Sequence, residues 1–127
     1  MSNKTVISTP NAPEAIGPYS QAVKVGNTIY ISGQIPLIPE TMEIVSGDIK
    51  EQTNRVFENL QAIAEASGGS FSKVVKINIS LTDLNHFTTV NKIMASYFKP
   101  PYPARTCVQV TALPKAADIE IEAIMAL

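Results

Sequence analysis

The sequence lacks the residues on which several common protein chemistries depend. It has one cysteine, Cys107, and one histidine, His86, among its 127 residues. A single cysteine excludes a disulfide framework within the chain, and with only one histidine it argues against a Cys/His metal site. The sequence also contains no Gly-Lys-Ser/Thr phosphate loop, no dinucleotide fingerprint and no Gly-x-Ser-x-Gly elbow.

An excess of positive charge and a long apolar run are also missing. Ten basic residues face eleven acidic residues, for a net charge of -1. Nucleic-acid-binding proteins usually carry a clear basic excess, so a nucleic-acid partner is disfavoured. No apolar run approaches the ~18 residues of a membrane span. Residues 1–10 lack the apolar stretch of a signal peptide, so we expect a reducing, cytoplasmic setting.

The composition predicts a single folded domain over residues 1–127. Hydrophobic residues make up 45% of the chain and charged residues 17%, which suffices to bury a core without a metal or disulfide. Strands are expected at residues 4–8, 21–25, 28–32, 73–82, 105–111 and 119–125, and helices at 48–67 and 83–98. A mixed sheet covered on one face by two helices, an α+β fold, satisfies these patterns.

Local signals support several boundaries of these elements. Gly26-Asn27 is a tight-turn signal between the second and third strands. Asp48 and Glu51 are spaced to form a capping box at the start of the first helix, and Gly68-Gly69 can end it in a left-handed turn. Thr82 or Asp83 can cap the second helix.

The strands alternate apolar and polar residues, which predicts two different sheet faces. Val75, Ile77, Ile79 and Leu81, with alternate residues from Ile119 to Met125, are expected to face the helices. The other face then carries Lys76, Asn78, Ser80, Glu120 and Glu122. That face either meets water or is covered by a partner subunit.

Arg105 is the residue we expect to hold a ligand. It follows the rigid segment 100–103 and begins a strand, and its planar guanidinium matches a carboxylate with two hydrogen bonds. Cys107 lies on the same strand face. The alternative is at least as well supported by spacing alone: Arg105 pairs with a surface acid, and Cys107 is a buried small hydrophobe.

Further polar residues are weaker candidates. Glu120 and Glu122 share one face and could lie beside Arg105 if the last two strands pair; an ordinary polar face is the favoured alternative. Tyr19 lies in a turn, Ser32-Gly33 at a strand end where a glycine lets a ligand approach, and Asn91 within an apolar helix. His86 is interpreted as a solvated helix-start residue.

Four segments together resemble the RidA/YjgF family of reactive-intermediate deaminases, also known as endoribonuclease L-PSP or translation inhibitors. The segments are 15–21, 32–36, 103–108 and 113–123, in order and at family-like spacing. The resemblance implies a chorismate-mutase-like fold and a homotrimer, with a central β-barrel, helices outside and three clefts between subunits. It implies hydrolysis of 2-iminobutanoate and 2-iminopropanoate to 2-keto acids and ammonia, without cofactor or metal.

The resemblance also implies a role for each site residue. Arg105 would clamp the substrate carboxylate, Tyr19 would close over it, and Glu120 would activate a water with help from the Gly33 amide. The Cys107 carbonyl would meet the imine nitrogen, and Ser32 and Asn91 would line the pocket. The chain departs from the family at Thr106, at Gln109 and in a short connection before Pro103, which could alter the cleft rim.

The sequence is also compatible with two other functions. The same cleft could bind a 2-keto acid without turnover, as a regulatory module. An endoribonuclease is the third hypothesis, and the near-neutral charge and the lack of a second histidine argue against it.

Overall fold

The structure is a computed structural model that describes residues 3–127, so residues 1 and 2 of the predicted domain lie outside the described residues. Within that range it contains six strands and two α-helices. The strands are β1 (Lys4–Ile7), β2 (Ala22–Val25), β3 (Thr28–Gln34), β4 (Val74–Leu81), β5 (Ala104–Gln109) and β6 (Ile119–Ala126). The helices are α1 (Ile49–Ala66) and α2 (Phe87–Tyr97).

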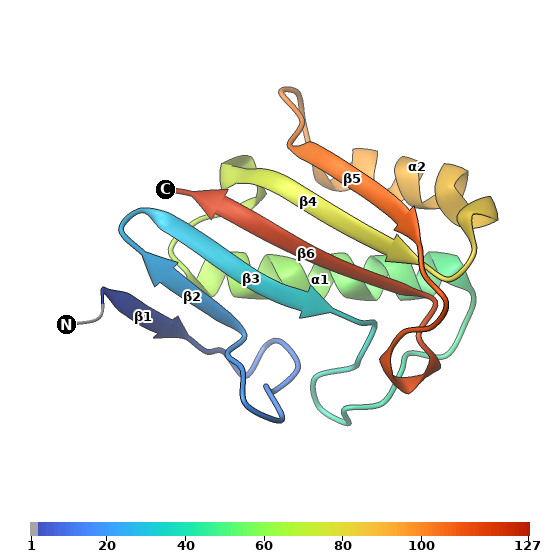
Figure 1. The fold of residues 1–127 in the computed structure, drawn as a ribbon, viewed down its shortest axis with the longest axis horizontal. Helices are drawn as coiled ribbons and strands as arrows, with labels where there is room; N and C mark the ends of the chain where they lie inside the picture. Colours follow the sequence, from blue (N-terminus) through green and yellow to red (C-terminus); the bar gives the residue numbers. More distant parts are fainter. Residues whose placement is uncertain (1–2) are drawn as a thin grey trace.

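The strands form one mixed sheet in the order β1-β2-β3-β6-β4-β5. All neighbours are antiparallel except β4 and β5, which are parallel. Both helices lie on the same face of the sheet, α1 behind the central strands and α2 behind β4 and β5 (Figure 1). The predicted mixed six-stranded sheet with two helices on one face is therefore confirmed.

The predicted turn and caps are present. Gly26, with φ of 60°, takes the first central position of the two-residue turn between β2 and β3, where a positive φ matches the strand twist. Asp48 and Glu51 form the capping box of α1. At its other end the N–H groups of Gly68 and Gly69 donate to the carbonyls of Glu65 and Ala64 at 3.0 and 3.1 Å, a Schellman motif.

The second helix begins later than predicted. A 3₁₀ turn, Leu84–His86, precedes α2, and the Asp83 side chain caps that turn by accepting from the Asn85 N–H at 2.9 Å. Asp83 is thus the capping residue, but of a tighter first turn that holds His86. The turn satisfies backbone groups that would otherwise be left without partners at the helix start.

The core lies between the sheet and the helices, and one predicted core residue is wrong. Ile77, Ile79 and Leu81 are buried as expected, whereas Val75 is 48% exposed. Val74 pairs with Met125 and Lys76 with the preceding residue of β6, so Val75 is an extra residue in β4. Such a β-bulge moves one side chain out of the alternation.

The sheet face opposite the helices is mixed rather than purely polar. Asn78 pairs with Glu122 and Ser80 with Glu120 on this face, as predicted, and the Asn78 amide donates to Glu122 at 2.8 Å. The same face also exposes the large apolar side chains of Val6, Val25, Tyr30 and Val108. Apolar side chains gathered on an open sheet face are typical of a surface that a partner covers.

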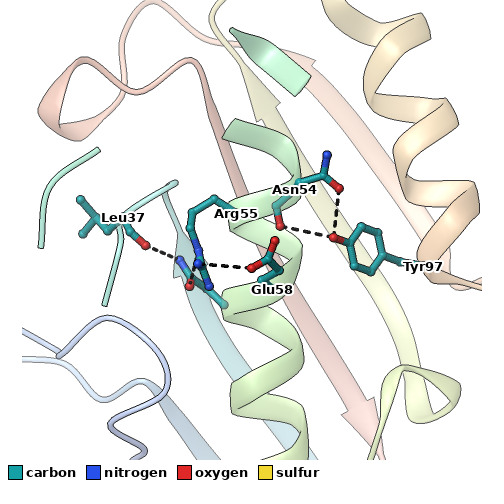
Figure 2. A network of polar contacts seen from close by, with 6 residues as sticks. Leu37, Asn54, Arg55, Glu58 and Tyr97 are labelled. Carbon is teal, nitrogen blue, oxygen red and sulfur yellow. Dashed lines mark hydrogen bonds and ion pairs between the residues drawn. The ribbon is translucent and has the colours of Figure 1, made fainter. Parts of the chain in front are cut away.

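Polar side chains of α1 hold neighbouring segments in place. Asn59 is fully buried, and its amide donates to the Leu37 carbonyl at 2.9 Å while accepting from Arg55 Nε at 3.2 Å. Arg55 also contacts Glu58 at 3.2 Å, and the Tyr97 hydroxyl donates to Asn54 Oδ1 at 3.0 Å (Figure 2). These contacts fix the segment after β3 and the end of α2 against α1.

A second tether joins α1 to the start of β6. The Gln52 amide donates to Asp118 Oδ2 at 2.9 Å and accepts from the Asp118 backbone N–H at 3.0 Å. Gln52 is 7% exposed, so these bonds form with little competition from water. They place the chain two residues before Glu120.

We predict that Gln52→Leu lowers the free energy of unfolding by about 3 kcal/mol. The change removes one bond to a charged carboxylate and one to a neutral N–H, and it leaves both groups half-buried without those partners. Urea unfolding at fixed protein concentration measures the effect. The control is Gln61→Leu, the same change at an exposed position of α1, expected within about 0.5 kcal/mol of the parent. An equal loss of unfolding free energy in both variants would contradict a stabilising role for the Gln52–Asp118 hydrogen bonds.

Candidate active site

Arg105 lies on the edge strand β5 and its side chain reaches α2. It pairs with the buried Ile77, so it leaves the sheet on the helix-facing side. Its Nη1 donates to Asn91 Oδ1 at 2.5 Å, and the guanidinium carbon lies 5.1 Å from the centre of the Phe87 ring. Among residues 3–127 no ion pair joins Arg105 to a carboxylate, so the surface ion pair considered from the sequence is absent.

The surroundings of Arg105 orient its positive charge toward a cavity. The ring of Phe87 attracts a guanidinium over its face by a cation–π interaction, and Asn91 fixes one nitrogen. The cavity has a volume of about 450 Å³ and is lined by Asn91, Met94, Ala95, Tyr102, Pro103 and Arg105. An oriented guanidinium beside an open cavity can bind the carboxylate of a ligand.

Glu120 lines a second cavity, and its side chain leaves the sheet on the face opposite to that of Arg105. This cavity, of about 480 Å³, has three predicted site residues in its lining, Tyr19, Gly33 and Glu120, and an apolar wall that includes Ile16, Ile35, Leu37 and Met42. Apolar walls with a few convergent polar groups are typical of small-molecule sites.

Gly33 permits the close approach of Glu120. A Cβ atom at this position would lie 2.9 Å from the Glu120 carboxyl carbon, which is closer than real Cβ atoms come to other heavy atoms. The pairing of β3 with β6 shifts register between Ile31 and Gln34, so a bulge at Ser32-Gly33 turns the backbone toward β6. Only glycine lets the carboxyl group lie against this bulge.

Burial raises the pKa of the Glu120 carboxyl group, and the negative charge of Glu122 raises it further. Both effects disfavour the ionised form, since one removes water and the other adds a like charge. A raised pKa makes the carboxylate a stronger base. The group can therefore take a proton from a bound water or return one to a ligand.

Ser32 and Gln21 hold the backbone around the Glu120 cavity. The Ser32 hydroxyl donates to the Ser20 carbonyl at 2.5 Å, which fixes the segment that carries Tyr19. The Gln21 amide, 4% exposed, donates to the carbonyls of Thr9, Ala12 and Pro13 and accepts from the Thr9 N–H at 2.7 Å. The Ser32 hydroxyl is thus used in a structural hydrogen bond. Tyr19, which is 53% exposed, borders the cavity.

Cys107 shares the helix-facing side of β5 with Arg105, as predicted. It pairs with the buried Ile79 and packs against the core. Burial raises the pKa of its thiol, and the positive charge of Arg105 opposes that shift only in part. The neutral thiol is favoured at physiological pH, which matches a small hydrophobe rather than a nucleophile.

One condition that the sequence analysis considered for the site is not met. The last two strands do not pair, because β4 lies between β5 and β6. Arg105 therefore lies on the helix side of the sheet, and Glu120 lies on the other side, facing Ser80. Within one chain the predicted residues form two groups, Arg105 with Asn91 and Tyr19 with Gly33 and Glu120.

The sequence analysis did not single out Phe87 and missed its contact with Arg105. The signal was available, because Phe87 and Asn91 are four residues apart and share one helix face. Lys115 and Met42, which also line the Glu120 cavity, were missed entirely. Residues 3–127 contain no group of three or more His, Cys, Asp or Glu side chains arranged to hold a metal ion. None of the helices in this range could cross a membrane.

Comparison with known proteins identifies the class to which this fold and these cavities belong. Residues 9–127 match the family described as Endoribonuclease L-PSP. A 2-iminobutanoate/2-iminopropanoate deaminase of Dermatophagoides farinae is 50% identical over 127 residues, which cover 100% of this chain and 99% of the relative. The chain therefore belongs to the Endoribonuclease L-PSP family, the RidA/YjgF family that its segments resemble.

Solved structures agree with this assignment. RidA from the Antarctic bacterium Psychrobacter sp. superposes with a TM-score of 0.93 at 54% identity, covering 97% of this chain and 99% of that chain. TdcF of E. coli, solved with bound serine, has a TM-score of 0.91 at 43% identity and covers 97% and 98% of the two chains. The fold around both cavities is thus shared along nearly the whole chain.

We predict that the stability of Glu120→Gln relative to the parent depends on pH. The pKa of Glu120 is raised in the folded state, so the folded state binds more protons than the unfolded state between the two pKa values. The parent therefore loses stability as pH rises through that window, whereas glutamine cannot ionise.

The melting temperature of Glu120→Gln should exceed that of the parent at about pH 7, and the gain should shrink at about pH 4. Thermal unfolding at constant ionic strength and protein concentration measures it. Glu65→Gln, an exposed site on α1, controls for the loss of a negative charge. A gain of the same size at both pH values would mean that Glu120 carries no burial penalty.

Proposed function

We propose that this chain hydrolyses short 2-imino acids, such as 2-iminobutanoate and 2-iminopropanoate, to 2-keto acids and ammonia. The observation that carries the proposal is Glu120, a carboxyl group of raised pKa that lies against the Gly33 backbone in a largely apolar cavity. The full-length likeness to a relative named as this deaminase supports the choice of substrate.

The proposed reaction adds water to an imine carbon that is already electrophilic. The Glu120 carboxylate accepts a proton from the water while the water oxygen bonds to the imine carbon. The Gly33 N–H assists in placing the water. The nitrogen gains protons, the C–N bond breaks, and ammonia leaves as the carbonyl forms. One imino acid and one water thus give one keto acid and one ammonia.

Arg105 is proposed to bind the substrate carboxylate with two hydrogen bonds. Its contacts with Asn91 and Phe87 hold the guanidinium before the ligand arrives, so little ordering is left for the binding step. The Cys107 carbonyl is proposed to meet the imine nitrogen, and Tyr19 to close over the site. Fixing the carboxylate near the activated water supplies the rate acceleration.

We further propose that the chain acts as a homotrimer in which each site joins two subunits. The separation of Arg105 and Glu120 on opposite sides of the sheet supports this arrangement, because one chain cannot bring them together. The exposed apolar residues Val6, Tyr30 and Val108 on the open sheet face supply a surface for a partner to cover.

A second candidate is binding of a small carboxylic acid without turnover. Serine, bound in the solved TdcF structure, carries the carboxylate and the nitrogen that an imino acid also carries. The two functions separate in one assay in which a dehydratase generates the imine and semicarbazide competes for it. Faster keto-acid release with the protein present supports hydrolysis, whereas binding of 2-ketobutyrate with no acceleration supports a binding module.

Mixing two inactive variants tests the role of each residue and the shared site together. Arg105→Ala and Glu120→Gln are each expected to reduce kcat/KM by at least about 100-fold, because one loses the clamp and the other the base. After co-refolding at equal amounts, random assembly should restore about one quarter of the sites, those with Arg105 from one parent and Glu120 from the other.

The control for this experiment is the same pair mixed without unfolding, which should remain inactive until subunits exchange. Mass measurement of the refolded protein reports the trimer. If the co-refolded trimer stayed as inactive as its components, Arg105 and Glu120 would have to act within one chain or not at all.

A further inference from the structure

Met42 has a backbone conformation that favours glycine. Its φ is 60°, and it follows a turn closed by hydrogen bonds from the Met42 N–H to the Ile38 carbonyl at 2.7 Å and from the Ile38 N–H to the Glu43 carbonyl at 2.9 Å. Short hairpin loops of this kind usually place glycine at the left-handed residue. A long side chain in this conformation strains the backbone, and such strain is typical of residues with a function.

Met42 is one of the apolar residues that line the Glu120 cavity. Ile35 and Leu37 belong to the same wall. Leu37 is itself held by the buried Asn59 amide at 2.9 Å and pairs with Ile44 across the hairpin. The hairpin that presents Met42 is thus anchored to α1.

Lys115 holds the same loop by a direct hydrogen bond. Its Nζ donates to the Met42 carbonyl at 3.0 Å, and Lys115 also lines the cavity. Lys115 and Ala116 have φ of 56° and 57°, so a second left-handed segment is hydrogen-bonded to the first. Two strained segments joined at one cavity indicate a shape that the surrounding structure maintains.

We propose that Met42 limits the length of the carbon side chain that the Glu120 cavity accepts. The inference rests on the proposed function, in which this cavity holds the imino acid. The carboxylate and imine of the substrate face Arg105 and Glu120, and its carbon side chain lies against the apolar wall at Met42. Imino acids with a methyl or ethyl group fit, whereas a longer chain such as that of the leucine-derived imine meets the methionine side chain.

The test compares Met42→Gly with Ala116→Gly. Both changes place glycine at a left-handed position, so both relieve backbone strain and should raise the melting temperature by a few degrees, roughly 2–6 °C. Only Met42→Gly removes a side chain from the cavity wall, since Ala116 does not line the cavity. The pair therefore separates the effect of cavity shape from that of stability.

The readout is the ratio of kcat/KM for two imines, one derived from leucine and one from alanine, generated by an amino-acid oxidase. Met42→Gly should raise this ratio at least about tenfold, the effect of removing about one clashing methylene. Ala116→Gly should leave it unchanged. Equal ratios in the parent and both variants would overturn the proposal.

Binding of 2-keto acids separates failure of this inference from failure of the proposed function. The ratio of Kd for 2-oxobutanoate and 4-methyl-2-oxopentanoate, measured by calorimetry, should change tenfold in favour of the larger acid in Met42→Gly. A changed ratio in a protein that does not hydrolyse imines would overturn the deaminase but keep Met42 as the limit. Binding of neither acid by the parent would overturn both.

Discussion

The pairing of β6 between β3 and β4 is the constraint on which both the core and the site depend. This one strand sends Ile119, Ile121 and Met125 into the core, where each is fully buried, and it sends Glu120 to the other face. Its register with β3 contains the bulge at Ser32-Gly33 that meets the Glu120 carboxyl. A slip of one residue would exchange the two faces and bury both glutamates.

The fold also separates the two charged groups to which we assign the proposed chemistry. The strand β4 lies between β5 and β6, and the alternation of side chains then directs Arg105 to the helix side and Glu120 to the open side. In an isolated chain, Arg105 as the proposed carboxylate clamp and Glu120 as the proposed base could not act on one small molecule. The exposed apolar residues of the open face favour association with a second subunit. We propose that this association completes the site.

Local chemistry explains which features could be predicted from the sequence. Alternation in residues 119–125, the turn at Gly26 and the capping box at Asp48 each depend on a few neighbouring residues, and all three are present. The bulges at Val75 and at Ser32-Gly33 could not be predicted, because a pattern of period two does not reveal an extra residue. Strand order depends on packing of the whole sheet, so the position of β4 was missed.

The site residues also divide into those that the sequence predicts and those that it does not. Arg105 and Asn91 could be nominated because a lone arginine after prolines and a lone amide on an apolar helix stand out in the sequence. Phe87 shares a helix face with Asn91, but the sequence does not show that this face meets the Arg105 guanidinium. Met42 and Lys115 have no signal of this kind, since their importance lies in left-handed backbone conformations that non-glycine residues rarely adopt.

The buried amide of Gln21 has a consequence for the chemical lifetime of the protein. Its nitrogen donates to three carbonyl oxygens, and its oxygen accepts from the Thr9 N–H. Hydrolysis of this one amide to a carboxylate would set an acceptor against three acceptors. The segment from Thr9 to Pro13 would lose its anchor, and Pro13 forms part of the Glu120 cavity. An intact Gln21 amide, which burial shields from water, is thus a condition for this part of the cavity wall.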